Sequence, residues 1–142
     1  MLAQLLLGAA LIALTVAIHG AVMGWLTWRL GQRRVTGDSL WNHYALLSKV
    51  ALWCVLAHLA EIALWGTAYW WKAVHPSFEI ALYFSAVTYA TIGYGDITPP
   101  AAWRLLASME GLTGILMCAW SGGFIFAIVT RLHQDASARG AA

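Results

Sequence analysis

The chain has 142 residues, of which 61% are hydrophobic and 10% are charged, and its formal net charge is +2. A soluble domain carries about 25% charged residues. This composition therefore excludes a soluble domain and indicates a membrane protein. The small net charge also argues against a nucleic-acid partner. Cys54 and Cys118 lie in separate apolar runs, which predicts two free thiols rather than a disulfide or a metal site.

The N-terminal segment, residues 1–30, is predicted to be a transmembrane helix. Its stretch from Met1 to Trp28 has no charged side chain, and about 20 apolar residues are enough to span a bilayer. Because the segment lacks a basic start and a small-residue cleavage site, we interpret it as a retained helix rather than a signal peptide.

Two further segments, 45–71 and 105–132, are long and apolar enough to cross the membrane. They are predicted to be the outer and inner helices of one domain at 44–132. The tail at 133–142 is polar and too short to fold by itself, so it is expected to be disordered.

Basic residues indicate the orientation of the chain. Most of them follow the first and the last segment: Arg29, Arg33, Arg34, Arg131 and Arg139. Lys72 and Arg104 lie on the opposite side. By the positive-inside rule, the N-terminus is expected outside and the C-terminus in the cytoplasm of a multi-pass cell-membrane protein.

The linker at 31–43 is therefore predicted to be cytoplasmic. A short helix on the membrane surface, beginning near Asp38 or Ser39, would bring Arg33 and Arg34 to anionic lipid headgroups.

A fourth apolar run, 78–90, is too short to span a membrane and predicts a re-entrant helix. Ser77 is a plausible N-cap, and Glu79 lies in the first turn, where an acidic side chain is favourable. The chain must return through "TIGYGD", residues 91–96. Irregular backbone at membrane depth is tolerated only inside protein or along a water-filled cavity, so this stretch is predicted to line a pore.

Glycine gives this stretch its conformational freedom. Gly93 and Gly95 can adopt backbone angles closed to other residues, which allows successive carbonyls to point toward one axis. A ring of such carbonyls replaces the hydration shell of a cation.

The hexapeptide resembles the potassium-channel pore family, in which the pattern is T-[VI]-G-Y-G-D, and the resemblance covers residues 51–132. It implies an all-α membrane protein with three transmembrane helices, a re-entrant pore helix and a selectivity-filter loop, assembled as a tetramer. It also assigns K⁺ coordination to the filter residues Thr91, Ile92, Gly93 and Tyr94, with Gly95 allowing the outward turn.

The resemblance assigns supporting roles around the filter. Tyr83 and Phe84 stand where many members have two tryptophans, so a tether to Asp96 or Tyr94 must come from Tyr83, and Tyr94 is expected in an aromatic cuff with the pore helix. Val87 replaces an acid that some members place behind the filter.

Gly114 in the inner helix is either a gating hinge or a site of close helix packing. Gly122 and Gly123 are predicted to serve packing beside Trp120.

Ionisable residues inside the spans need polar partners. Glu61 and His58 share a helix face and predict either a pH-sensitive clamp behind the pore helix or a structural hydrogen bond of Glu61 to Ser85, Thr88 or Tyr89. Glu110 is expected to brace the filter or to pair locally. His19 is interpreted as a satisfied packing residue rather than a ligand.

The favoured function is a K⁺-selective channel without enzymatic activity or cofactor, whose partners are three further copies of the chain, membrane lipids and the permeant K⁺. A non-conducting accessory subunit and a less selective cation channel are the alternatives.

Overall fold

The computed structural model describes residues 2–32 and 40–140. Its regular elements are all helical: α1 (Leu2–Gln32), α2 (Leu40–Trp71), α3 (Phe78–Tyr89), the 3₁₀ turn η1 (Ala101–Trp103) and α4 (Arg104–Gly140). Three of these regions are long and apolar enough to cross a membrane, namely Leu2–Gln32, Trp41–Trp71 and Ala101–Gln134. The predicted all-α class with three spans is confirmed.

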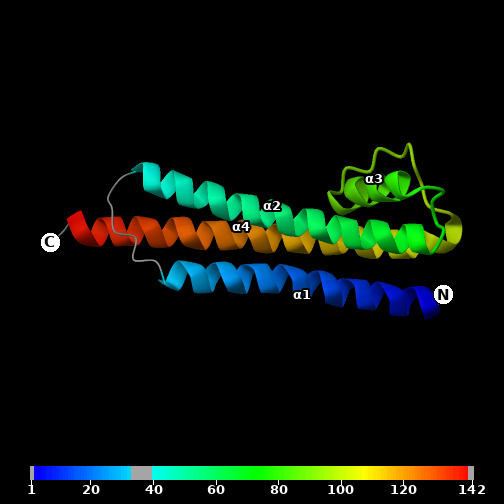
Figure 1. Ribbon diagram of the computed structural model, residues 1–142, viewed down its shortest axis with the longest axis horizontal. Helices are drawn as coiled ribbons and strands as arrows, with labels where there is room; N and C mark the ends of the chain where they lie inside the picture. The colour runs from blue at the N-terminus through cyan, green and yellow to red at the C-terminus, as the bar shows by residue number, and fades with distance from the viewer. Residues whose placement is uncertain (1, 33–39, 141–142) are drawn as a thin grey trace.

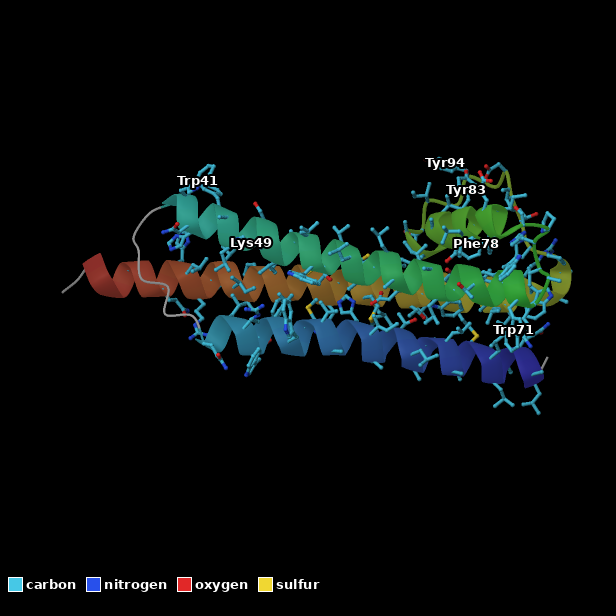
Figure 2. All side chains as sticks on the ribbon, in the orientation of Figure 1. Trp41, Lys49, Trp71, Phe78, Tyr83 and Tyr94 are labelled. Atoms are coloured by element: carbon cyan, nitrogen blue, oxygen red, sulfur yellow. The ribbon has the colours of Figure 1, made fainter. Side chains whose placement is uncertain are left out.

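The three long helices run side by side, and α3 is a short helix packed near one end of them (Figure 1). α3 contacts α2 and α4, whereas α1 packs against α2 and α4 from the opposite side (Figure 1). The N-terminus lies at the same end of the bundle as α3. Trp41 and Trp71 mark the two opposite ends of α2 (Figure 2).

Two boundaries differ from the sequence-based expectation. α2 begins at Leu40 rather than near 45, and the segment 133–140, expected to be disordered, continues α4 as helix. That expectation is wrong because these residues extend an already nucleated helix, which adds one hydrogen bond per residue without a new nucleation cost. Arg33 and Arg34, and the helix start near Asp38 or Ser39, lie outside the described residues.

Packing between the helices divides into two apolar clusters with polar side chains between them. The outer cluster, near α3, contains Leu11, Trp65, Ala68, Tyr69, Val74, Ala81, Phe84 and Leu106. The inner cluster contains Met23, Leu26, Val50 and Cys54. Along α1 and α2, buried His19 and Glu61 fall between these two sets. The middle of the bundle is therefore polar although its two ends are apolar.

α3 begins as its sequence predicts. Ser77 is the N-cap in an extended conformation, and its hydroxyl accepts a hydrogen bond from the Ile80 amide at 3.2 Å. Glu79 lies in the first turn, where its charge complements the free amides of the helix start. The cap thus fixes where the short helix starts and, through its length, where the following loop leaves it.

Candidate functional site: a pore loop at the carboxyl end of α3

The loop after α3 alternates its backbone handedness. Thr91, Gly93 and Gly95 have φ angles of +57°, +57° and +78°, whereas Ile92 and Tyr94 are not in the positive-φ region. In ordinary extended chain successive carbonyls point to opposite sides. Reversing every second residue would bring successive carbonyls to the same side, and the positive φ angles include those of the two glycines.

The amides of the loop are directed back toward α3. The amide of Thr91 donates to the Thr88 carbonyl at 3.0 Å, and those of Ile92 and Gly93 donate to the Val87 carbonyl at 2.9 and 3.2 Å. In the described part of the chain, no hydrogen bond is accepted by a backbone carbonyl of residues 91–95. The carbonyl oxygens of these five residues are therefore free of protein hydrogen bonds in the described chain.

Tyr83 ties the far end of the loop to α3. Its hydroxyl donates to Asp96 Oδ2 at 2.7 Å, which is the tether expected from this residue. The hydrogen bond to Asp96 raises the pKa of the Tyr83 hydroxyl. Tyr83 and Tyr94 both lie on the side of α3 away from the long helices (Figure 2). Tyr94 is 70% exposed in the single chain, so a cuff around it requires a neighbouring subunit.

Phe84 packs against α2 inside the helix bundle. It is buried in the outer apolar cluster, with its ring 4.6 Å from that of His75 and 5.2 Å from that of Tyr69. Successive residues of a helix point in different directions, so Tyr83 bonds to the loop while Phe84 packs against Tyr69 of α2. The support of the filter by Phe84 stays a prediction. Burial lowers the pKa of the neighbouring His75.

Gly114 allows α4 to approach the carboxyl end of α3. A Cβ at this position would lie 2.0 Å from the Tyr89 carbonyl oxygen, a backbone atom. Gly111 lies one turn earlier, where a Cβ would be 3.5 Å from the Thr88 carbonyl oxygen. The close approach accounts for Gly114 as a packing residue. At Gly122 and Gly123 a Cβ would meet nothing within 4 Å in the single chain, so the packing predicted there is not found within the protomer.

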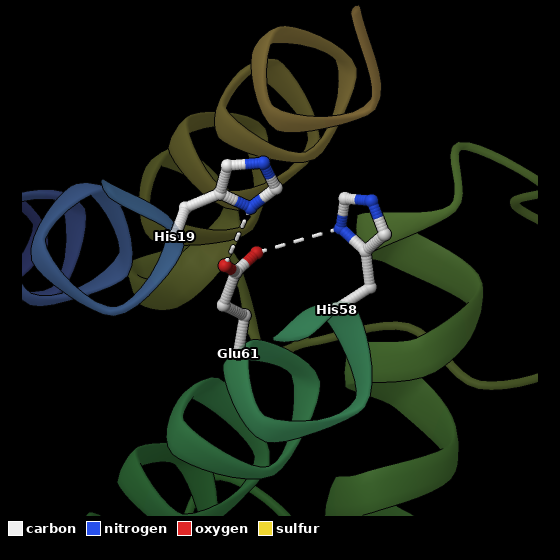
Figure 3. A group of neighbouring side chains, drawn as sticks. All are labelled: His19, His58 and Glu61. Atoms are coloured by element: carbon white, nitrogen blue, oxygen red, sulfur yellow. Dashed lines mark hydrogen bonds and ion pairs between the residues drawn. The ribbon is translucent and has the colours of Figure 1, made fainter. Parts of the chain in front are cut away.

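Glu61 forms a hydrogen-bonded cluster behind the loop (Figure 3). Its Oε1 lies 2.9 Å from His19 Nδ1, and its Oε2 lies 3.5 Å from His58 Nδ1. Its Oε2 also accepts a hydrogen bond from the hydroxyl of Tyr89, the last residue of α3. Of the three partners considered from sequence, Tyr89 is correct. Ser85 bonds to Glu110 instead, and no hydrogen bond from Thr88 to Glu61 is present in the described residues.

Glu110 forms a second buried network. Its carboxylate accepts hydrogen bonds from Tyr69 of α2 at 2.8 Å and from Ser85 of α3 at 2.5 Å. Glu110 thus joins α4 to α3 and α2, so it braces the helix before the loop rather than pairing within α4.

His19 is a buried residue with satisfied ring nitrogens, as predicted, but sequence analysis missed its partners and the contributions of Ser121 and Tyr69. The available signal was that a buried ionisable residue in a membrane span needs a polar partner. That rule states the need without naming a partner on another helix, because the rotation of one helix against another cannot be read from one sequence.

A family model described as ion channel matches residues 57–131, which is more than half of the chain. The chain belongs to the ion channel family. The match begins in the middle of α2, includes α3 and the loop after it, and ends within α4 at residue 131.

One curated relative of the channel is Protein LctB of Geobacillus stearothermophilus. The two are 39% identical over 61 residues, which is 43% of this chain and 40% of that protein. The alignment thus spans less than half of the relative's length. No solved structure matches the channel.

Proposed function

We propose that the channel conducts K⁺ passively and selectively through a fourfold ring made by the carbonyls of Thr91, Ile92, Gly93 and Tyr94. The observation that carries the proposal is the alternating handedness of the loop, with positive φ at 91, 93 and 95. It supports a row of carbonyls on one side, and such a row replaces the water shell of a dehydrating ion.

A single chain supplies one loop, and one row of carbonyls cannot enclose an ion. Four copies around an axis close the ring, as in the family that the hexapeptide resembles. Large apolar side chains of α4 remain exposed in the single chain, among them Leu112, Ile115, Leu116 and Phe126. Their exposure supports burial against neighbouring copies or lipid. The carboxyl end of each α3 would then direct its partial negative charge toward the centre, which favours a cation there.

The proposed orientation has the N-terminus, α3 and the loop on the outer side and the C-terminus in the cytoplasm. It is supported by the arginines near the opposite end, Arg29 and Arg131. The N-terminus and α3 share one end of the bundle (Figure 1), as this topology requires.

The test is reconstitution of the purified chain in a planar bilayer with K⁺ on one side and Na⁺ on the other. We expect a reversal potential that follows the K⁺ gradient and does not respond to Na⁺. Equal permeability of the two ions would instead identify the less selective cation channel, and absence of current from an assembled protein would favour the accessory-subunit alternative.

A further inference from the structure

Three potential metal ligands converge between α1 and α2, behind the loop that follows α3. His19 comes from α1, and His58 and Glu61 come from adjacent turns of α2 (Figure 3). One ligand atom from each lies within 4.8 Å of the other two. His19 and Glu61 are fully buried, and the side chain of His58 is 18% exposed. The cluster is thus held inside the bundle but is reachable from one side of the chain.

Each of these ligands has a second polar partner that fixes its orientation. Ser121 Oγ lies 3.2 Å from His19 Nε2 and 3.1 Å from His58 Nε2. The Tyr89 hydroxyl donates to the Glu61 carboxylate. Ligating histidines commonly bond through their other ring nitrogen, and ligating carboxylates are themselves hydrogen-bonded. The cluster has both features.

The proton inventory leaves open a tautomer in which both Nδ1 atoms are free to bind a cation. Ser121 has one hydroxyl proton and two lone pairs, so it can donate to one imidazole at most, and at least one ring must donate its Nε2–H to Ser121. When both rings do so, both Nδ1 atoms carry lone pairs. The Nδ1 of His19 lies 2.9 Å from Glu61 Oε1. The Nδ1 of His58 lies 3.0 Å from the Tyr89 hydroxyl and 3.5 Å from Glu61 Oε2. In this tautomer a bound cation would attract both lone pairs and the Glu61 carboxylate, and buried charges are commonly paired or coordinate a metal.

We propose that His19, His58 and Glu61 bind a divalent transition-metal ion of the zinc class, with both imidazoles coordinating through Nδ1. Two histidines and one glutamate form a known ligand set for Zn²⁺, with a fourth position left for water. Zn–N and Zn–O bonds of about 2.0–2.2 Å in a tetrahedron separate the ligand atoms by about 3.3 Å. The observed distances are 2.9 Å from His19 Nδ1 to Glu61 Oε1 and 3.5 Å from His58 Nδ1 to the other oxygen, Oε2. With one ligand atom from each residue within 4.8 Å of the other two, side-chain rotation would bring the three atoms to the tetrahedral spacing.

Neutral imidazoles and an ionised Glu61 would bind the ion without releasing a proton, whereas a protonated imidazole would have to release one. Each imidazole keeps its proton on Nε2 and donates it to Ser121, whose two lone pairs accept both. The ion would hold α1 to α2, and through Glu61 it would hold Tyr89, which lies just before the pore loop. The site is independent of K⁺ selectivity, so its test does not rely on conduction.

The experiment uses the full chain in detergent, stripped with a chelator and titrated with Co²⁺ and then with Zn²⁺. We expect about one ion per chain, visible absorption bands of four-coordinate Co²⁺ and displacement of these bands by Zn²⁺. His19→Gln and Glu61→Gln should abolish the bands. Ser121→Ala keeps all three ligands and should weaken metal affinity by about 10–100-fold.

The matched control is His133→Gln, which removes an exposed histidine of α4 outside the cluster and should bind as the unmodified chain does. Elution volume and far-ultraviolet circular dichroism verify that each variant is folded. If a ligand variant does not fold, the metal affinity of Ser121→Ala tests the proposal in its place. The proposal is overturned if the unmodified chain retains no Zn²⁺ at micromolar free metal, which would leave a protonated imidazole as the cation. It is also overturned if the ligand variants and Ser121→Ala bind metal like the control.

Discussion

At the scale of single residues, Gly93 is set apart by its backbone angle and not by crowding. Its φ is +57°, yet a Cβ would meet nothing within 4 Å in the single chain. We expect Gly93→Ala to abolish K⁺ flux while leaving assembly intact, because an L-residue in this region costs about 1–2 kcal/mol per subunit and the strain is repeated around the ring. The K⁺ flux across vesicles that contain the variant measures conduction, and its elution volume in detergent measures assembly.

Gly24→Ala is the matched control for this change. Gly24 lies in α1 with open space around it and no positive φ, so the variant should conduct like the unmodified chain. A Gly93→Ala protein that elutes normally and conducts at the unmodified rate would contradict the assignment of these carbonyls to the ion path.

The Tyr83–Asp96 hydrogen bond predicts how firmly the outer end of the loop is held. Tyr83→Phe removes the donor and should keep K⁺ selectivity but speed the decay of current during sustained opening, since the loop end loses its link to α3. Tyr44→Phe, on an exposed tyrosine of α2, is the control and should leave the decay unchanged. Current decay in bilayer recordings is the readout.

The same hydrogen bond predicts a pH dependence with a defined sign. Because the pKa of Tyr83 is raised, its stabilising contribution is fully present below the ordinary tyrosine pKa of about 10 and is lost as pH rises through the raised value. Decay should therefore quicken at strongly alkaline pH in the unmodified channel and not in Tyr83→Phe. Equal responses of the two proteins would mean that another group controls the loop.

At this scale, the sequence predicts features that depend on the chemistry of one residue and its near neighbours, but not contacts between distant helices. The positive φ angles at Gly93 and Gly95 followed from glycine chemistry, and the bond from Tyr83 to Asp96 followed from the lack of a donor on Phe84. The bond between His19 and Glu61 did not, because these residues are 42 positions apart on different helices and their meeting depends on how α1 rotates against α2.

At the scale of elements, the approach of α4 to the carboxyl end of α3 depends on Gly114. Gly114→Ala would place a methyl group 2.0 Å from the Tyr89 carbonyl oxygen, so the two helices must separate. We expect a loss of about 1–3 kcal/mol, the usual cost of overpacking, seen as a lower midpoint in thermal unfolding. Gly122→Ala, with no atom within 4 Å of the added carbon, is the control and should not lower the midpoint.

The outcome also separates the two interpretations of Gly114. A midpoint equal to that of Gly122→Ala, together with an altered open probability, would show a hinge without a packing role. The sequence left this choice open because a glycine in an inner helix serves both purposes equally well. Only the position of Tyr89 relative to α4 distinguishes them, and that position depends on where α3 ends.

At the scale of the whole molecule, the proposed homotetramer follows from one loop per chain and the exposed apolar face of α4. Native mass spectrometry of the detergent-extracted protein should give four chains of 15.5 kDa each. Cross-linking in the membrane provides the control against association caused by detergent. Active preparations that contain only monomers and dimers would contradict the fourfold ring.

The three spans and the short re-entrant helix were predictable because their lengths and apolar runs are local properties. The placement of α1 was not, since nothing in its sequence shows that it packs on the side of α2 and α4 opposite to α3. The extension of α4 beyond 132 was missed for a related reason: composition describes a polar segment as unfolded unless the helix that continues into it is known.

The length of α4 has a mechanical consequence. Its 37 residues measure about 55 Å at 1.5 Å per residue, whereas the hydrocarbon core is about 30 Å thick. The final turns must therefore stand in water as a rigid continuation of the inner helix. In a fourfold assembly, four such rigid helices would transmit any tilt or twist applied at their ends to the helices around the proposed ion path. A flexible tail would not transmit it.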